Sequence, residues 1–194
     1  MGGPLIALTG ATGFIGRHLL QSLSRHGFRV RVLLRRPVGV PEGASSAVVC
    51  DLTRPMNMAA ALAGVDAVVH SAGLSPTMSG TPEDDFRASN TEATLRLAEA
   101  SVRARVQRFV FLSSIRAQTG ISAPGLVTES DLPAPTEAYG RSKLAAEGAL
   151  AETGLDWVAL RPVLVYGAGV TGNVAVTLRQ RNAPDIRAST TVTI

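Results

Sequence analysis

Short runs of apolar residues alternate along this chain with longer segments in which apolar positions recur every three or four residues. The short runs are typical of buried strands, and the recurrent spacing is typical of amphipathic helices. Strands are expected at residues 5–9, 30–34, 47–50, 66–70, 108–112 and 157–160, and helices at 14–26, 56–62, 83–105 and 137–152. Strands separated by helices form right-handed βαβ units. We therefore expect an α/β fold with a doubly wound parallel sheet, helices on both faces and the strand order 3-2-1-4-5-6.

A glycine-rich turn joins the first predicted strand to the first predicted helix. Gly10, Gly13 and Gly16 lie in the run 9–16, which reads TGATGFIG. Glycine permits a tight turn and the close approach of a backbone to a pyrophosphate, and the start of the following helix favours an anion. We expect Gly16 to let the helix pack close to the sheet. A glycine triplet alone is also typical of a structural turn, but this position between strand and helix favours dinucleotide binding.

The single lysine of the chain lies four residues after a tyrosine. Tyr139 and Lys143 fall in the predicted helix 137–152, where positions four apart share a face. A free tyrosine has a pKa of about 10, and a nearby ammonium group lowers that pKa by favouring the phenolate. We therefore expect Tyr139 to exchange a proton with a substrate hydroxyl. An ordinary helix with a packed tyrosine is the alternative, but it does not explain why one lysine among 19 lysines and arginines stands here.

Together these motifs resemble the extended short-chain dehydrogenases/reductases, the NAD-dependent epimerase/dehydratase family. The resemblance covers about residues 4 to 174. Its further matches are Asp51-Leu52, His70-Ser71-Ala72-Gly73, Asn90, Ser113-Ser114 and the run 161–167, RPVLVYG. The resemblance implies a Rossmann-type fold, an NAD(P) cofactor and chemistry at a hydroxyl or keto group, often on a nucleotide-linked sugar.

The resemblance also implies roles for individual residues. Tyr139 is the acid/base, Ser114 hydrogen-bonds the reacting oxygen, and Lys143 lowers the tyrosine pKa and holds the nicotinamide ribose. The residues expected to bind the cofactor are Gly10, Thr12, Gly13, Phe14, Ile15, Gly16, Arg35, Asp51, Leu52, Ser71, Ala72, Gly73, Asn90, Tyr139, Lys143, Pro162 and Val163. In the family, Asp51 meets the adenine, and the segment at Pro162 and Val163 holds the carboxamide. His70 is assigned to packing rather than catalysis, and Ser114 is preferred to Ser113.

The end of the second predicted strand bears on the choice between NAD and NADP. NAD sites place an acid about twenty residues after the glycines, on the ribose hydroxyls. Leu34 aligns best with that acid, and Arg35 and Arg36 follow it. An arginine binds the additional phosphate of NADP, which a carboxylate would repel. We therefore expect NADP, with NAD as the alternative; in the other interpretation, both arginines are solvated surface side chains.

Composition and charge exclude several other classes of protein. The net charge of +4 invites a nucleic-acid partner, but aromatic residues make up 4% of the chain and the arginines are scattered, so none is expected. No run is apolar enough to span a membrane, although the mean hydropathy is +0.20. We find no signal peptide, and the single cysteine, Cys50, fits a reducing cytoplasm. No cluster has the residue spacing of a metal site.

The sequence leaves the reaction open. A sugar 4,6-dehydratase would need an Asp-Glu pair beside the active hydroxyl, whereas Ile115 and Arg116 follow Ser114, so dehydration is not expected. A 4-epimerase-like enzyme and a ketone or alcohol reductase both fit. The alternative from another class is a non-catalytic NAD(P)-binding protein or an inactive truncated fragment. Non-catalytic relatives usually lose the tyrosine or the lysine, and both are present here.

The last residues of the chain have no helical period and little to bury. We expect an NAD(P)-binding domain at 1–178, a short tail at 179–194 and a substrate-binding lobe that is largely missing. Such a chain is expected to bind a dinucleotide and to turn over nucleotide sugars negligibly by itself. By analogy with relatives, a homodimer would form through the helices 83–105 and 137–152.

Overall fold

The computed structural model describes residues 3–54, 56–76, 80–123 and 125–167, and a six-stranded sheet forms within them. Its strands are β1 (Leu5–Thr9), β2 (Arg29–Leu34), β3 (Ser46–Val49), β4 (Ala67–His70), β5 (Arg108–Leu112) and β6 (Trp157–Leu160). The order is β3-β2-β1-β4-β5-β6, which confirms the prediction. Every neighbouring pair is parallel, so the carboxyl ends of the strands meet at one edge of the sheet.

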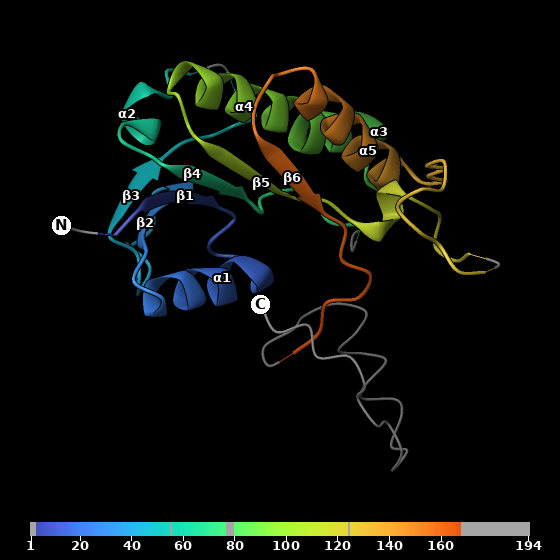
Figure 1. Ribbon diagram of the computed structural model, residues 1–194, viewed down its shortest axis with the longest axis horizontal. Helices are drawn as coiled ribbons and strands as arrows, with labels where there is room; N and C mark the ends of the chain where they lie inside the picture. The colour runs from blue at the N-terminus through green and yellow to red at the C-terminus, as the bar shows by residue number, and fades with distance from the viewer. Residues whose placement is uncertain (1–2, 55, 77–79, 124, 168–194) are drawn as a thin grey trace, which may run out of the picture.

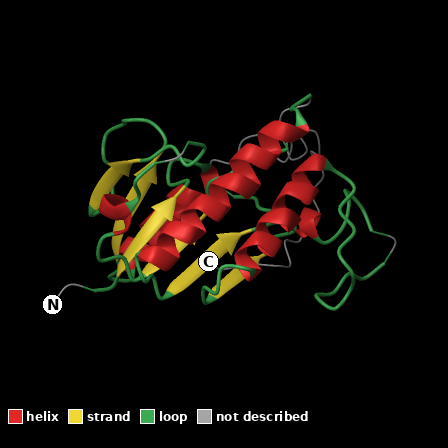
Figure 2. Ribbon diagram, turned by 90° about the horizontal axis from the view of Figure 1, so that it is seen from above, coloured by secondary structure: helices red, strands yellow, loops and turns green. Residues whose placement is uncertain are grey.

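Helices lie on both faces of this sheet (Figure 1). Helix α1 (Phe14–Arg25) lies on one face, and α2 (Ala59–Leu62), α3 (Glu83–Phe86), α4 (Ala93–Arg103) and α5 (Ala138–Ala151) lie on the other. Seen from above, α4 and α5 lie side by side over the sheet, roughly along the direction of the strands (Figure 2). The sheet therefore separates two layers of helices, as a doubly wound fold requires.

Two predicted helices differ from the observed ones. Residues 56–58 are not helical, so α2 is shorter than predicted. The helix predicted at 83–105 is interrupted by a π-helical segment at Arg87–Glu92, which lies between α3 and α4. The other predicted elements agree with the structure to within one residue at either end.

The strands hold together because their residues enter two separate cores. On β1, Leu5 and Ala7 pack among residues of α4 and α5, whereas Leu8 packs with Leu20 of α1. Both Phe109 and Phe111 of β5 are fully buried in the larger core. A parallel sheet covered on both faces needs such near-continuous apolar strands, and this explains why the short apolar runs were a reliable signal.

Within the described ranges, no helix has the length and apolar character needed to cross a membrane. Across those same residues, no three histidine, cysteine or acidic side chains gather as metal ligands. The domain boundary predicted at residue 178 and the tail after it lie outside the described residues.

Candidate functional site

The glycine-rich turn begins where β1 ends and closes before α1 begins. Gly10 has a φ of +72°, and its carbonyl accepts the N–H of Gly13 at 2.9 Å. A Cβ on Gly10 would lie 2.7 Å from the nitrogen of Ala72, and one on Gly16 would lie 2.0 Å from the Gly10 carbonyl oxygen. Both positions therefore require glycine. Gly16 was expected to allow close packing of the helix on the sheet. Its close approach is instead to the glycine turn, at Gly10 and Ala11.

The N-terminus of α1 is suited to an anion. Gly13 is its N-cap, no side chain caps the helix, and no acidic residue lies in its first turn. The first N–H groups of a helix have no partner within the helix, and together with the helix dipole they favour a phosphate. Thr12 is exposed here, and Phe14 and Ile15 are half-buried. The residues present therefore fit the pyrophosphate of a dinucleotide.

The loop after β4 packs against this turn. The N–H groups of Ser71 and Ala72 donate to the Thr9 hydroxyl at 3.1 and 3.0 Å. A Cβ on Gly73 would lie 3.2 Å from the Lys143 Nζ, so this loop and the lysine lie against one another. The residues after β4 that are expected to line the cofactor thus connect the glycine turn to the site around Lys143.

Asn90 lies in the π-helical segment and is fully buried. Its Oδ1 accepts the N–H of Leu74 at 2.7 Å, and its Nδ2 donates to the Leu74 carbonyl at 3.1 Å and to the Ser142 hydroxyl at 3.0 Å. These bonds join the loop after β4 to α5. The amide of Asn90 is therefore engaged with neighbouring protein groups. π-Helical segments are frequently found at functional sites.

Tyr139 and Ser114 meet at the carboxyl edge of the sheet. Burial raises the pKa of Tyr139 above its usual value, and a hydrogen bond with the Ser114 side chain and the charge of Arg116 act against that rise. The sequence predicted a lowered pKa. Burial acts in the opposite direction, because desolvation outweighs the favourable contacts of the phenolate.

Lys143 lies one turn after Tyr139, but its ammonium group is directed at the end of β5. Its Nζ donates to the Leu112 carbonyl at 3.0 Å and lies 4.7 Å from the centre of the Phe111 ring. Burial lowers the pKa of Lys143 to about 8, and the Glu147 carboxylate acts in the opposite direction. Because this pKa is close to neutral pH, small changes around Lys143 can change the charge of its amine.

A glycine that the sequence analysis did not single out brings Tyr139 to Ser114. Ser114 is the N-cap of a short 3₁₀-helix, η2 (Ile115–Ala117), and its hydroxyl accepts the N–H of Arg116 at 3.2 Å. A Cβ on Gly140 would lie 2.1 Å from the Arg116 carbonyl oxygen. Helix α5 therefore approaches η2 at Gly140, beside Tyr139.

Ser113 belongs to a polar network that the sequence did not reveal. Its hydroxyl donates to the carboxylate of Glu147, and that carboxylate accepts two further hydrogen bonds from Arg161. Glu147 is buried. Arg161, which follows β6, also donates to the side chain of Gln118. This network joins β5, β6 and α5. One feature of the sequence could have indicated Glu147 as part of the site. It lies four residues after Lys143 and therefore on the same face of the helix.

The segment after β6 lies beside η2. The Pro162 carbonyl accepts the N–H of Ile115 at 3.1 Å, and the Val163 side chain is exposed. The structure thus brings Pro162 to the same carboxyl edge as Ser114.

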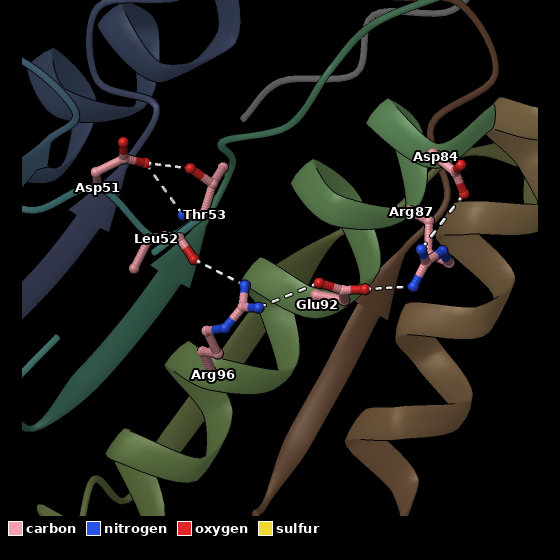
Figure 3. Close-up of polar contacts among 7 residues, drawn as sticks. All are labelled: Asp51, Leu52, Thr53, Asp84, Arg87, Glu92 and Arg96. Carbon is pink, nitrogen blue, oxygen red and sulfur yellow. Dashed lines mark hydrogen bonds and ion pairs between the residues drawn. The ribbon is translucent and has the colours of Figure 1, made fainter. Parts of the chain in front are cut away.

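The opposite half of that edge carries Arg35 and Asp51. Leu34 is buried at the end of β2, and Arg35 and Arg36 are exposed. The Asp51 carboxylate accepts the N–H and the hydroxyl of Thr53 at 3.1 and 2.7 Å (Figure 3). These bonds lower the pKa of Asp51, and the charges of Arg54 and Arg35 lower it further. Arg35 and Asp51 follow adjacent strand ends, since the N–H of Cys50 donates to the Leu34 carbonyl at 2.7 Å.

The chain belongs to the NAD dependent epimerase/dehydratase family, whose sequence profile matches residues 6–185. It is 34% identical to a UDP-glucose 4-epimerase of Vibrio cholerae over 185 residues, which are 90% of this chain and 56% of that enzyme. It is 33% identical to a ceramide reductase of Caulobacter vibrioides over 170 residues, 86% of this chain and 48% of that one.

A solved structure of MoeE5 with UDP-glucose and NAD superposes with a TM-score of 0.72 and 37% identity, and covers 82% of this chain and 54% of that one. The chain thus spans about half the length of the relatives it matches. The fold and the family agree with the resemblance seen in the sequence.

Proposed function

We propose that this chain carries the NAD(P)-binding and proton-transferring half of an oxidoreductase or epimerase that acts on a hydroxyl or keto group. One observation carries the proposal. The hydrogen-bonded pair Tyr139 and Ser114, with Lys143 one turn away, stands at the same sheet edge as a glycine turn that fits a pyrophosphate.

Each of the three side chains has a task in this proposal. When bound, the nicotinamide supplies or accepts a hydride at the carbon that carries the substrate oxygen. Ser114 hydrogen-bonds that oxygen, and Tyr139 exchanges a proton with it. Because burial raises the pKa of Tyr139, the phenol holds its proton at neutral pH, which suits donation to a carbonyl during reduction. Lys143 binds the nicotinamide ribose, and the loop 71–73 lines the same half of the cofactor.

The proposed substrate is a nucleotide sugar. The UDP-glucose 4-epimerase of Vibrio cholerae and the MoeE5 structure with UDP-glucose and NAD support this class. The ceramide reductase of Caulobacter vibrioides supports instead a reductase for a lipid-linked group. The choice between epimerase and reductase, a cytoplasmic location and a homodimer through α4 and α5 stay predictions.

The test of this proposal is calorimetric titration of the purified chain with NAD and NADP, followed by a turnover assay with UDP-glucose and a keto substrate. Tyr139→Phe is expected to abolish hydride transfer and to leave dinucleotide binding nearly unchanged, because it removes only the ionisable oxygen. Turnover by the variant near the wild-type rate would exclude Tyr139 as the acid/base. A chain that binds neither dinucleotide contradicts the proposal as a whole, and robust turnover by the purified chain would contradict the expectation that it turns over nucleotide sugars negligibly by itself.

We also propose NADP as the preferred cofactor, with Arg35 on its additional phosphate. Arg35 is exposed directly after β2, where Leu34 stands in place of a carboxylate. Arg35→Gln is expected to weaken NADP binding and leave NAD binding unchanged, whereas the neighbouring Arg36→Gln serves as the control. A clear preference of the wild-type chain for NAD would contradict this role.

A further inference from the structure

The turn that follows β3 is held by an arginine of α4. In this turn, 51–54, the N–H of Arg54 donates to the Asp51 carbonyl at 3.1 Å. The carbonyl of the second residue in such a turn, here Leu52, has no partner within the turn itself. Arg96 supplies the donor, because its Nη1 lies 3.3 Å from the Leu52 oxygen (Figure 3).

The peptide group between Leu52 and Thr53 is consequently anchored on both sides. Its N–H donates to the Asp51 carboxylate at 3.1 Å, and its carbonyl accepts from Arg96. A planar trans peptide directs N–H and C=O in opposite directions. These two bonds therefore fix the orientation of the turn, and one of them comes from a helix 44 residues further along the chain.

Arg96 is itself positioned by a line of charges along the helix (Figure 3). Its Nη2 donates to Glu92 at 3.1 Å, the other Glu92 oxygen accepts from Arg87 at 2.5 Å, and Arg87 reaches Asp84 at 3.3 Å. Side chains three or four apart share a face of an α-helix. Arg87 and Glu92 are five apart and pair across the π-helical segment. The Glu92 carboxylate thus links the π-helical segment to the arginine that holds Leu52.

We propose that Arg96 is a positioning residue for the adenine half of the dinucleotide and acts through the turn 51–54. The inference rests on the proposed function. In a sheet of this order a dinucleotide lies across the switch point between β1 and β4. Tyr139 and Lys143 place the nicotinamide half beyond β4, so the adenine half lies over the ends of β2 and β3. The turn 51–54 stands there.

The experiment titrates the full chain calorimetrically with two probes. ADP-ribose carries the adenine half without nicotinamide, and nicotinamide mononucleotide carries the other half. Arg96→Met is expected to weaken ADP-ribose binding about threefold to tenfold, which corresponds to the net contribution of one ordinary hydrogen bond, because Arg96 acts on the ligand only through the turn. Binding of nicotinamide mononucleotide is expected to stay unchanged. If the hydrogen bond from Arg96 to Leu52 only stabilised the fold, its loss would not weaken the binding of one probe and spare the other.

Arg103→Met is the matched control, because Arg103 forms an exposed ion pair with Glu99 at 4.0 Å on the same helix. It is expected to bind both probes like the wild type. Equal ADP-ribose affinity in wild type and Arg96→Met, an equal loss in Arg103→Met, or an equal loss of both probes would overturn the inference.

A more conservative variant keeps the inference testable if Arg96→Met does not fold. Glu92→Gln retains Arg96 but removes the charge that orients it, and a smaller loss for ADP-ribose alone is expected. No loss overturns the inference. A wild-type chain that binds neither probe contradicts the proposed function itself, and this inference with it.

Discussion

Thr9 and His70 stand opposite each other at the ends of β1 and β4 and share a hydrogen bond of 2.7 Å. The Thr9 hydroxyl accepts the N–H groups of Ser71 and Ala72, so it donates its own hydrogen to the His70 Nδ1. The other ring nitrogen, Nε2, therefore carries the hydrogen and donates to the Thr94 hydroxyl at 2.9 Å. A neutral histidine of fixed tautomer joins the glycine turn to α4, which agrees with packing rather than catalysis.

His70 is expected to make the fold sensitive to acid. Burial lowers its pKa from 6.5 to about 3, with a smaller contribution from the charge of Lys143. Between these values the unfolded chain binds more protons than the folded one, so stability falls as the pH drops below 6.5. The expected slope is up to about 1.4 kcal/mol per pH unit. The measurement is denaturant unfolding of wild type and His70→Gln from pH 7 to 4.

The comparison for His70 uses slopes, because the substitution also removes hydrogen bonds at every pH. His70→Gln is expected to show a shallower fall with acid than the wild type. His18→Gln, which changes an exposed histidine of α1, is the matched control for replacing a histidine. Parallel curves for wild type and His70→Gln would show that His70 is not the group that titrates.

Gly140 is expected to tolerate no side chain. The Cβ of an alanine would lie 2.1 Å from the Arg116 carbonyl oxygen, so α5 would have to move away from η2 and take Tyr139 from Ser114. Gly140→Ala is expected to lower both the melting temperature and any turnover. Gly148→Ala on the same helix meets nothing within 4 Å and is expected to raise stability by about 0.5–1 kcal/mol through helix propensity. Two alanine variants of equal stability would refute the close-contact argument.

The sheet order and the main motifs were predictable because they depend on local patterns. The apolar runs of β1 and β5, the glycine turn and the spacing of Tyr139 and Lys143 are each visible within a few residues. The π-helical segment was not predictable, since it is held by contacts of Asn90 with Leu74 and Ser142 from other elements.

The direction of the Tyr139 pKa shift was not predictable for the same kind of reason. Spacing on a helix shows that Lys143 is near, but not that its ammonium is directed at the Leu112 carbonyl. Burial is a property of the assembled fold, and it decides the sign here. The pairing of Glu147 with Arg161 likewise joins two elements that show no relation in the sequence.

Glu147 is expected to be one of the most sensitive charged positions. Glu147→Gln leaves the guanidinium of Arg161 without its carboxylate. The Arg161 side chain is 24% exposed and that of Glu147 is 8% exposed, so the expected loss is about 1–3 kcal/mol, below the cost of about 3–5 kcal/mol for breaking a fully buried pair. Glu152→Gln, on an exposed residue at the end of the same helix, is the control and should change little. Unfolding in denaturant measures both. A loss below about 1 kcal/mol, the range of an exposed pair, would mean that the network is not buried in solution.

Lys143 is expected to produce the same pH trend as His70, at higher pH. Its folded pKa is about 8 and its ordinary value is 10.5, so the unfolded chain holds more protons between these values. Stability should therefore rise with pH across this window, by up to about 1.4 kcal/mol per unit, as the cost of burying the ammonium disappears. Lys143→Met lacks this term. The unfolding free energy of the wild type minus that of the variant should therefore increase from pH 8 upward.

The variant comparison also removes the contribution of Cys50. Burial raises the pKa of that thiol from 9.0 to about 11, which lowers stability above pH 9 in both proteins and cancels in their difference. Glu147→Gln gives a second check, because the Glu147 carboxylate acts to raise the Lys143 pKa. In that variant the rise in stability should begin at a lower pH. If the difference between wild type and Lys143→Met stays constant from pH 7 to 10, the ammonium is not buried in solution, and its assignment to the interior of the site is wrong.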